Sequence, residues 1–113
     1  MKYDLEERTA SFAVNVIKLC SKINKTVLTI PIVDQLIRSG TSIGANYIEA
    51  CDASSKKDFK NKVYICKKES METKYWLRVL SQTSPALTKD CRVLWREAQE
   101  LTLIFSTITK NTI

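Results

Sequence analysis

The sequence predicts an all-α protein, an up-down-up-down antiparallel four-helix bundle. The 113 residues include only two glycines and two prolines, so few turns interrupt the chain. Four stretches repeat apolar residues in alternating steps of three and four, which is typical of helices with one buried face. Short connections separate these stretches and therefore favour antiparallel neighbours. A chain of this length is expected to form one domain, residues 1–113, with a core of its own.

The first helix is expected over residues 4–25 and the second over residues 32–52. The buried stripe of the first comprises Leu5, Thr9, Phe12, Val16, Leu19 and Ile23. The buried stripe of the second comprises Val33, Leu36, Gly40, Ile43, Tyr47 and Ala50. The β-branched connection, residues 26–31, is expected to be an apolar loop tucked onto the bundle. Pro31 suits the first turn of the second helix, where its missing N–H is no loss.

Gly40 and Gly44 are unusual inside the second helix, because glycine there costs about 1 kcal/mol relative to alanine. They lie four residues apart and therefore share one narrow strip of the helix surface. We expect this strip to let a neighbouring helix pack closely, which would compensate for the cost.

The third helix is expected over residues 56–82 and the fourth over residues 86–109. Ser55 and Asp58 resemble a capping box in which Asp replaces the usual Glu. The buried stripe of the third helix is polar in its middle and comprises Phe59, Val63, Cys66, Ser70, Thr73, Leu77 and Leu80. The stripe of the fourth is the most regular and comprises Leu87, Cys91, Leu94, Ala98, Leu101, Phe105 and Ile108. The last residues, 110–113, are expected to fray.

Composition argues against several classes of protein. The four cysteines form no C-x-x-C pair and the chain has no histidine, so no metal or cofactor is expected. The cysteines are instead predicted to be buried small hydrophobes, one per helix: Cys20, Cys51, Cys66 and Cys91. No apolar run approaches the roughly 18 residues that span a bilayer, and the charged start does not suit a signal peptide. We therefore expect a cytoplasmic protein with no membrane partner.

The formal net charge of +6 is concentrated in the third helix, because residues 54–82 alone carry an excess of five positive charges. At 100° per residue, one side of this helix collects Lys56, Lys60, Lys67, Lys74 and Arg78. A second side, almost opposite the core, collects apolar residues with lysines among them: Lys57, Tyr64, Lys68, Met71, Tyr75 and Val79. A helix with apolar stripes on two opposite sides cannot bury both inside one small bundle.

Two explanations of this second side remain open. The apolar stripe of Tyr64, Met71, Tyr75 and Val79 could bury against another copy of the chain, which is the interpretation we favour for these four residues. Alternatively, aromatic side chains among lysines could form a nucleic-acid surface, where phosphates meet Lys and bases meet Tyr. The lysines could also be simply a solvated helix face.

Several motifs together resemble one small four-helix-bundle family. They are Ser42-Ile43, then Asn46-Tyr47-Ile48-Glu49-Ala50, then Ser54-x-x-x-Asp58-Phe59, then Ser70-x-Glu72. The family includes the proteins encoded within 23S ribosomal RNA intervening sequences and the related accessory variability proteins of diversity-generating retroelements. Its second motif usually reads Asn-Ile-Ala-Glu-Gly, so Tyr47, Ile48 and Ala50 depart from it. The resemblance implies a homo-oligomer, a ring-like pentamer. Accessory variability members bind nucleic acid and a reverse transcriptase through a positive surface, which implies RNA or DNA, and in a retroelement context a reverse transcriptase, as partners.

One set of polar residues could suggest an active site: Asn46, Glu49, Ser70 and Glu72. Ser42, on the same side of the second helix as Asn46 and Glu49, is expected to be a structural polar residue. Helical rise, however, separates Glu49 from Glu72 by roughly 20 Å in antiparallel helices, too far for a carboxylate pair. We expect these residues to have structural roles, with Asn46 and Glu49 capping helix ends or pairing with Arg38 or Lys56. No phosphate-binding loop or nucleophile elbow occurs, so we do not expect an enzyme. The sequence thus favours a non-catalytic oligomer that binds nucleic acid through the third helix, or alternatively a protein scaffold without that role.

Overall fold

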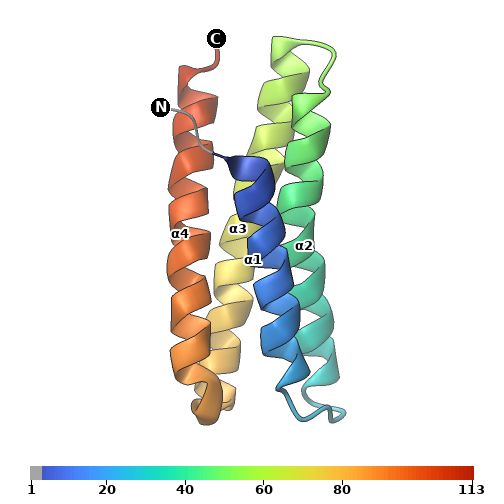
Figure 1. The fold of residues 1–113 in the computed structure, drawn as a ribbon, viewed down its shortest axis with the longest axis vertical. Helices are drawn as coiled ribbons and strands as arrows, with labels where there is room; N and C mark the ends of the chain where they lie inside the picture. The colour runs from blue at the N-terminus through green and yellow to red at the C-terminus, as the bar shows by residue number, and fades with distance from the viewer. Residues whose placement is uncertain (1–3) are drawn as a thin grey trace.

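The structure, a computed structural model, describes residues 4–113, so the first three residues of the charged start lie outside the described part. The helices are α1 (Leu5–Ser21), α2 (Ile30–Cys51), α3 (Lys56–Thr83) and α4 (Thr88–Asn111), with one short 3₁₀ turn, η1 (Pro85–Leu87), before α4. Figure 1 shows successive helices running in opposite directions, in an elongated body of 45 × 24 × 19 Å. The prediction of an all-α antiparallel four-helix bundle is confirmed.

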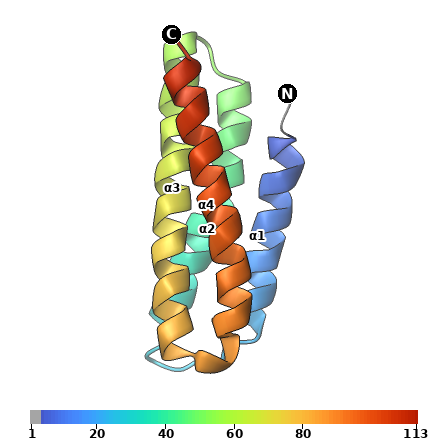
Figure 2. The same cartoon turned by 90° about the vertical axis from the view of Figure 1, so that its left-hand side faces the viewer.

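The helices follow one another around the bundle, so that α1 packs on α2, α2 on α3, α3 on α4, and α4 on α1. Figures 1 and 2, which differ by a quarter turn, show this ring of four helices from two sides. The α1–α4 pair approaches least closely along its length, and α1 is the shortest helix, with 17 residues against 28 in α3. The α3–α4 pair has the most extensive contact of any two helices.

The first connection differs most from expectation. α1 ends at Ser21 rather than near residue 25, and a turn closed by Thr26 and Thr29 follows at residues 24–29. Thr29 Oγ1 accepts a hydrogen bond from the Thr26 N–H (2.7 Å) and lies 2.8 Å from the Asn24 carbonyl oxygen. This tight turn directs Val27 and Leu28 outward, where they are 87% and 81% exposed. The expectation of an apolar loop tucked onto the bundle is therefore wrong.

The other helix boundaries lie close to those predicted. α2 begins at Ile30, with Pro31 in its first turn as expected. At α3, the Ser55 hydroxyl accepts from the Asp58 N–H (3.0 Å), while the Asp58 carboxylate accepts from Ser54 N–H (3.2 Å). The capping box is thus present, with its reciprocal bond moved by one residue. α4 begins later than predicted because Pro85 starts a 3₁₀ turn, and it continues through Asn111 instead of fraying from residue 110.

The four predicted stripes meet in one core. Every predicted stripe residue is buried except four, which are partly buried and pack against the edge of the core: Tyr47, Phe59, Leu87 and Ile108. The polar middle of the α3 stripe is also buried, with Ser70 and Thr73 at 0% exposure. Thr73 Oγ1 lies 2.9 Å from Ser39 Oγ and 2.7 Å from the Glu69 carbonyl oxygen, so these buried hydroxyls satisfy one another.

The glycine strip of α2 faces α1. A Cβ atom on Gly40 would lie 3.0 Å from Val16 Cγ2, and one on Gly44 would lie 2.8 Å from Thr9 Oγ1. Both distances are shorter than ordinary van der Waals contact, so a side chain at either position requires Val16 or Thr9 of α1 to shift. The predicted close helix approach is confirmed, and its partner is the first helix.

The cysteines divide into two groups. Cys20, Cys66 and Cys91 are buried, whereas Cys51 is exposed, and all four are free thiols. The prediction that all four are buried is therefore wrong for Cys51. The reason is its position as the last residue of α2, where the stripe of that helix has already ended at Ala50.

Candidate nucleic-acid interface

Ion pairs join neighbouring helices at two of the interfaces in the bundle, α2–α3 and α1–α4. Between α2 and α3, Arg38 binds Glu69 at 3.1 Å and also binds Glu72, and Lys62 binds Glu49 at 3.1 Å. Arg38 therefore joins the two helices through α3 carboxylates, and the partner of Glu49 is Lys62 instead of the expected Arg38 or Lys56.

The remaining polar residues of the predicted set bind the backbone of their own helix. Asn46 Nδ2 donates to the Ser42 carbonyl oxygen at 2.8 Å, and the Ser70 hydroxyl donates to the Cys66 carbonyl oxygen at 2.9 Å. Ser42 itself hydrogen-bonds the Ser39 carbonyl at 3.0 Å. The structure thus does not bring these residues together into one site, and Glu49 and Glu72 belong to separate ion pairs.

Glu72 is the most connected carboxylate of the α2–α3 seam. Besides Arg38, the Trp76 indole N–H donates to Glu72 Oε2 at 3.1 Å. Burial alone would raise the pKa of the Glu72 carboxyl, but the hydrogen bonds from Arg38 and Trp76 outweigh it and lower that pKa. Glu72 is therefore a charged structural link at neutral pH and not a proton donor.

The α1–α4 seam is held by a second set of ion pairs. Arg8 binds Glu97 at 2.6 Å and Glu100 at 3.3 Å, and Lys22 binds Asp90 at 3.0 Å. The hydrogen bond to Glu97 is the main reason that the pKa of the Arg8 guanidinium is raised. The acidic side chains of α4 are therefore directed towards α1.

These pairs leave α3 and α4 with an excess of uncompensated positive charge. Residues 1–53 carry equal numbers of acidic and basic side chains, so the net charge of +6 belongs to residues 54–113. All carboxylates of α3 and α4 are engaged in the cap or in ion pairs: Asp58, Glu69, Glu72, Asp90, Glu97 and Glu100. Within residues 4–113, no ion pair engages these cations of α3 and α4: Lys56, Lys57, Lys60, Lys67, Lys74, Arg78, Lys89, Arg92, Arg96 and Lys110.

The predicted basic side of α3 adjoins α4. Lys74 Nζ hydrogen-bonds Gln99 and lies 5.4 Å from the centre of the Trp95 ring. Lys60 and Lys67 precede Lys74 by two and one steps of seven residues, so they lie on the same side of α3. All three are half-buried, whereas Lys56, Lys57, Lys68 and Arg78 are exposed. Long side chains of this kind cover apolar surface with their stems while the charged group stays in contact with water, which accounts for the partial burial of these three lysines.

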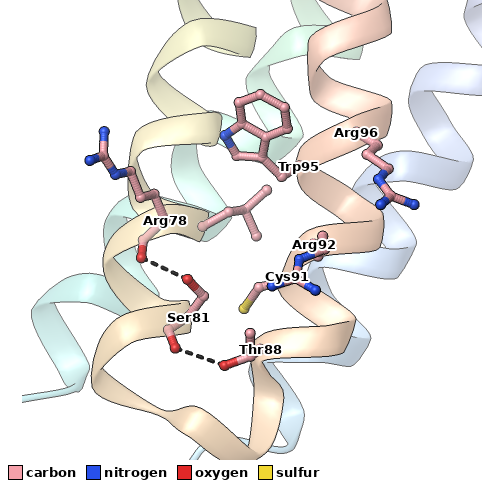
Figure 3. Close-up of a pocket in the computed structure, with 8 residues that line it drawn as sticks. Arg78, Ser81, Thr88, Cys91, Arg92, Trp95 and Arg96 are labelled. Carbon is pink, nitrogen blue, oxygen red and sulfur yellow. Dashed lines mark hydrogen bonds between the residues drawn. The ribbon is translucent and has the colours of Figure 1, made fainter.

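A groove of about 450 Å³ lies between α3 and α4 near their connection. α3 contributes Leu77, Arg78 and Ser81. α4 contributes Thr88, Cys91, Arg92, Trp95 and Arg96. Figure 3 shows the Trp95 ring between the two helices, with the guanidinium groups of Arg78 and Arg96 on opposite sides of it. We call the cations along this seam the basic face, which comprises Lys56, Lys60, Lys67, Lys74, Arg78, Arg92 and Arg96.

Sequence reasoning identified Arg78 but missed the contribution of α4. Arg92, Trp95 and Arg96 follow one another at helical spacing beside the core stripe of α4, which was the available signal. Their meeting with Arg78 depends on which sides of α3 and α4 face each other, and periodicity along one helix does not determine this.

Cys91 lies under the groove but is only 1% exposed. Burial, and to a smaller extent the nearby Asp90, raises the pKa of the Cys91 thiol to about 11. The thiol is thus protonated at neutral pH and is not an activated nucleophile. Within residues 4–113, no three His, Cys, Asp or Glu side chains converge in a way that suits a metal ion. No helix in the same range has the length and apolar character that crossing a membrane requires.

The predicted apolar stripe of α3 is displayed on the surface. Tyr64, Met71 and Tyr75 are 48%, 49% and 57% exposed, while Val79 is half-buried. The Tyr75 ring contacts Trp76 edge-on, with 5.0 Å between ring centres. Lys57 and Lys68, which were predicted on the same side of the helix, are also exposed, so this side of α3 is available for contact with another molecule.

Fold and surface together define a small antiparallel four-helix bundle with its charge excess on one pair of helices. The chain belongs to the family described as 23S rRNA-intervening sequence protein, which matches residues 1–107. The predicted resemblance to the proteins of 23S ribosomal RNA intervening sequences, drawn from the motifs between Ser42 and Glu72, is thereby confirmed.

A solved structure from the S23 ribosomal protein family of Bacteroides thetaiotaomicron VPI-5482, described as a protein with unknown function, is similar to this chain. It is 32% identical, covers 95% of this chain and 99% of its own, and superimposes with a TM-score of 0.84. Comparison with curated proteins gives no match.

Proposed function

We propose that this protein is a non-catalytic nucleic-acid-binding protein and that RNA or DNA binds along the basic face. The observation that supports this most directly is the difference between the acidic and the basic side chains of α3 and α4. The carboxylates of α3 and α4 are engaged elsewhere, while the cations of the basic face have no anionic partner in the described part of the chain. A polyanion can therefore bind them without first breaking an ion pair.

The geometry suits a phosphate backbone better than a single small anion. Lys60, Lys67 and Lys74 recur at intervals of seven residues, about 10 Å along a helix, and Arg78, Arg92 and Arg96 continue the positive surface towards the connection. Phosphate contacts distributed in this way supply affinity through counterion release and little sequence preference. Structured RNA is the first partner to test, since the names of the family and of its solved relative refer to ribosomal RNA and a ribosomal protein.

The test is a comparison of two charge reversals of equal size. Lys60→Glu with Lys67→Glu changes the basic face, and Lys18→Glu with Lys25→Glu makes the same change in net charge on exposed positions of α1 and the first connection. Binding of a fluorescent RNA hairpin is measured by anisotropy at several salt concentrations. We expect the first double variant to bind at least tenfold more weakly and to reduce the slope of log K against log salt by about 1–2.

The control double variant is expected to keep the salt slope of the unmodified protein. Equal weakening by both double variants would mean that only overall charge matters and that the basic face is not a binding surface. Unchanged binding in the first variant would exclude these lysines as phosphate contacts. Circular dichroism of each variant checks that the bundle remains folded.

We also propose that the chain self-associates through the apolar stripe of Tyr64, Met71, Tyr75 and Val79, consistent with the pentamer that the family resemblance implies. Three of its four members are about half exposed in the single chain. Large apolar side chains in a contiguous row are more often interfaces than isolated surface residues. A pure protein scaffold without nucleic-acid binding is the alternative that the hairpin experiment addresses.

A further inference from the structure

We propose that the groove between α3 and α4 accommodates one unpaired nucleobase of a single-stranded segment, stacked on Trp95 and flanked by phosphates that bind Arg78, Arg92 and Arg96. This inference rests on the proposed function and specifies it, because it makes single-stranded nucleic acid, in preference to a duplex, the ligand of the basic face.

The stacking platform is the groove side of Trp95. Trp95 is 37% exposed, a large fraction for a tryptophan beside a core. Lys74 Nζ lies 5.4 Å from the ring centre, and Trp95 lines the groove whereas Lys74 does not. The same cation–π contact fixes the ring, which reduces the entropy lost when a base stacks on it.

The hydroxyl groups of Ser81 and Thr88 on the wall of the groove are hydrogen-bond acceptors for a ligand. Ser81 Oγ donates to the Arg78 carbonyl oxygen at 2.9 Å, and Thr88 Oγ1 donates to the Ser81 carbonyl oxygen at 2.9 Å (Figure 3). Since each hydroxyl has one hydrogen and it is already engaged, both oxygens remain available as acceptors. A ligand that presents N–H donors to them is favoured, and nucleobases carry such imino and amino groups.

The arginines at the rim of the groove, in contrast, are hydrogen-bond donors. Arg78, Arg92 and Arg96 can only donate, and no Asp or Glu side chain lines the groove. The site therefore combines donors for an anion with acceptors and an aromatic ring for a planar group that carries N–H. A nucleotide has both parts in one unit, whereas an acidic side chain offers a carboxylate for the arginines but no planar ring to stack on Trp95.

Size and shape favour one base over a base pair. The volume of about 450 Å³ lies within the range of small-molecule sites, roughly 300–1,000 Å³. Leu77 and Cys91, each 1% exposed, form an apolar base to the groove and limit its depth. Bases in a duplex are stacked on one another and present only their edges, so only an unpaired base can place its ring against Trp95.

The experiment uses the full chain carrying Trp76→Phe, so that Trp95 is the remaining tryptophan of the two. Its fluorescence is titrated with a mixed-sequence single-stranded oligonucleotide and with a blunt-ended duplex of the same sequence. We expect saturable quenching by the single strand and little by the duplex. Trp95→Leu is expected to weaken single-strand binding, measured by anisotropy, about 5- to 150-fold while leaving duplex binding unchanged.

A second variant keeps the test decisive should Trp95→Leu unfold the bundle. Arg92→Gln with Arg96→Gln changes two exposed side chains and is expected to weaken single-strand binding more than duplex binding. Equal binding of both ligands with no quenching overturns the base-pocket inference but leaves the proposed function intact. Absence of binding to either ligand overturns both. Equally tight quenching by polyglutamate assigns the groove to an acidic peptide and overturns the inference.

Discussion

Gly44 of α2 lies against Thr9 of α1 so closely that a Cβ atom on Gly44 would be 2.8 Å from the threonine hydroxyl oxygen. Thr9 cannot easily move away, because it is buried and its hydroxyl lies 2.6 Å from the Leu5 carbonyl oxygen. The close approach of α1 and α2 therefore depends on the absence of a side chain at this position.

Gly44→Ala is expected to destabilise the protein although alanine is the better helix former. The gain in helix propensity is about 1 kcal/mol, while overpacking costs about 1–3 kcal/mol, so we expect a net loss of roughly 1 kcal/mol. Urea unfolding followed by circular dichroism measures the change in the free energy of unfolding. Adding Thr9→Ala removes the oxygen from the contact, so the double variant should be more stable than the sum of the two single changes predicts. Strict additivity would show that this contact does not limit the approach.

The link between Arg38 and Glu72 predicts a specific acid sensitivity. The pKa of the Glu72 carboxyl is lowered in the folded protein, so its stabilising effect is present above the unfolded value of about 4.3 and is lost as the pH falls through the lower folded pKa. Glu72→Gln should therefore flatten the decline of stability between about pH 5 and pH 3 by roughly 0.5–1 kcal/mol, a modest figure because the pair is partly exposed.

The measurement is the urea midpoint at several pH values. Glu6→Gln is the matched control, since Glu6 is exposed and forms no ion pair within residues 4–113. If Glu6→Gln changes the pH profile as much as Glu72→Gln does, the Arg38 link has no special role.

The cysteines should differ sharply in reactivity. Cys51 is exposed, whereas burial raises the pKa of the Cys66 thiol to about 12 and that of the Cys20 thiol to about 11. An aromatic disulfide reagent at pH 8 should therefore react rapidly with one thiol in the native protein and with all four in urea. Cys51→Ser should abolish the rapid reaction. A second rapid thiol in that variant would show that the core opens more readily than its packing indicates.

Assembly through the apolar stripe is tested by the mass in solution. Sedimentation equilibrium should give a particle several times heavier than the 12.9 kDa chain. Tyr64→Glu with Tyr75→Glu should yield monomers, because burying two carboxylates in an apolar interface is prohibitively costly. Val93→Glu with Leu103→Glu is the matched control on α4, where both residues are more than half exposed. Dissociation by the α4 pair and not by the α3 pair would assign the interface to the other helix.

The sequence was sufficient to predict the four helices, because the period of residues such as Phe12, Ile43 and Phe105 is a local property that the core then uses directly. It did not predict the turn at residues 24–29, where hydrogen bonds between Thr26 and Thr29 determine the path of the chain and override the burial of Val27.

The candidate site was also predicted only in part, because spacing along one helix is local whereas the packing of two helices is not. The basic side of α3 follows from spacing alone, and Lys74 and Arg78 lie where that spacing indicates. The groove, however, needs Trp95 of α4 to face Lys74 of α3, a relationship between two helices that depends on how they rotate about their axes. A single sequence carries little information about such rotation. In the structure, ion pairs between helices, such as Arg8–Glu97, show which sides of the helices face each other.

The unequal seams of the bundle imply an order of folding and of local opening. α2, α3 and α4 pack on neighbours that adjoin them in sequence, so most of their contacts form over short chain separations and should form quickly. α1 is the shortest helix, and it closes the ring against α4 with few backbone approaches and with ion pairs at Arg8 and Lys22. Its amide hydrogens should therefore exchange through a partial opening that leaves the other three helices intact, at a free energy below that of global unfolding.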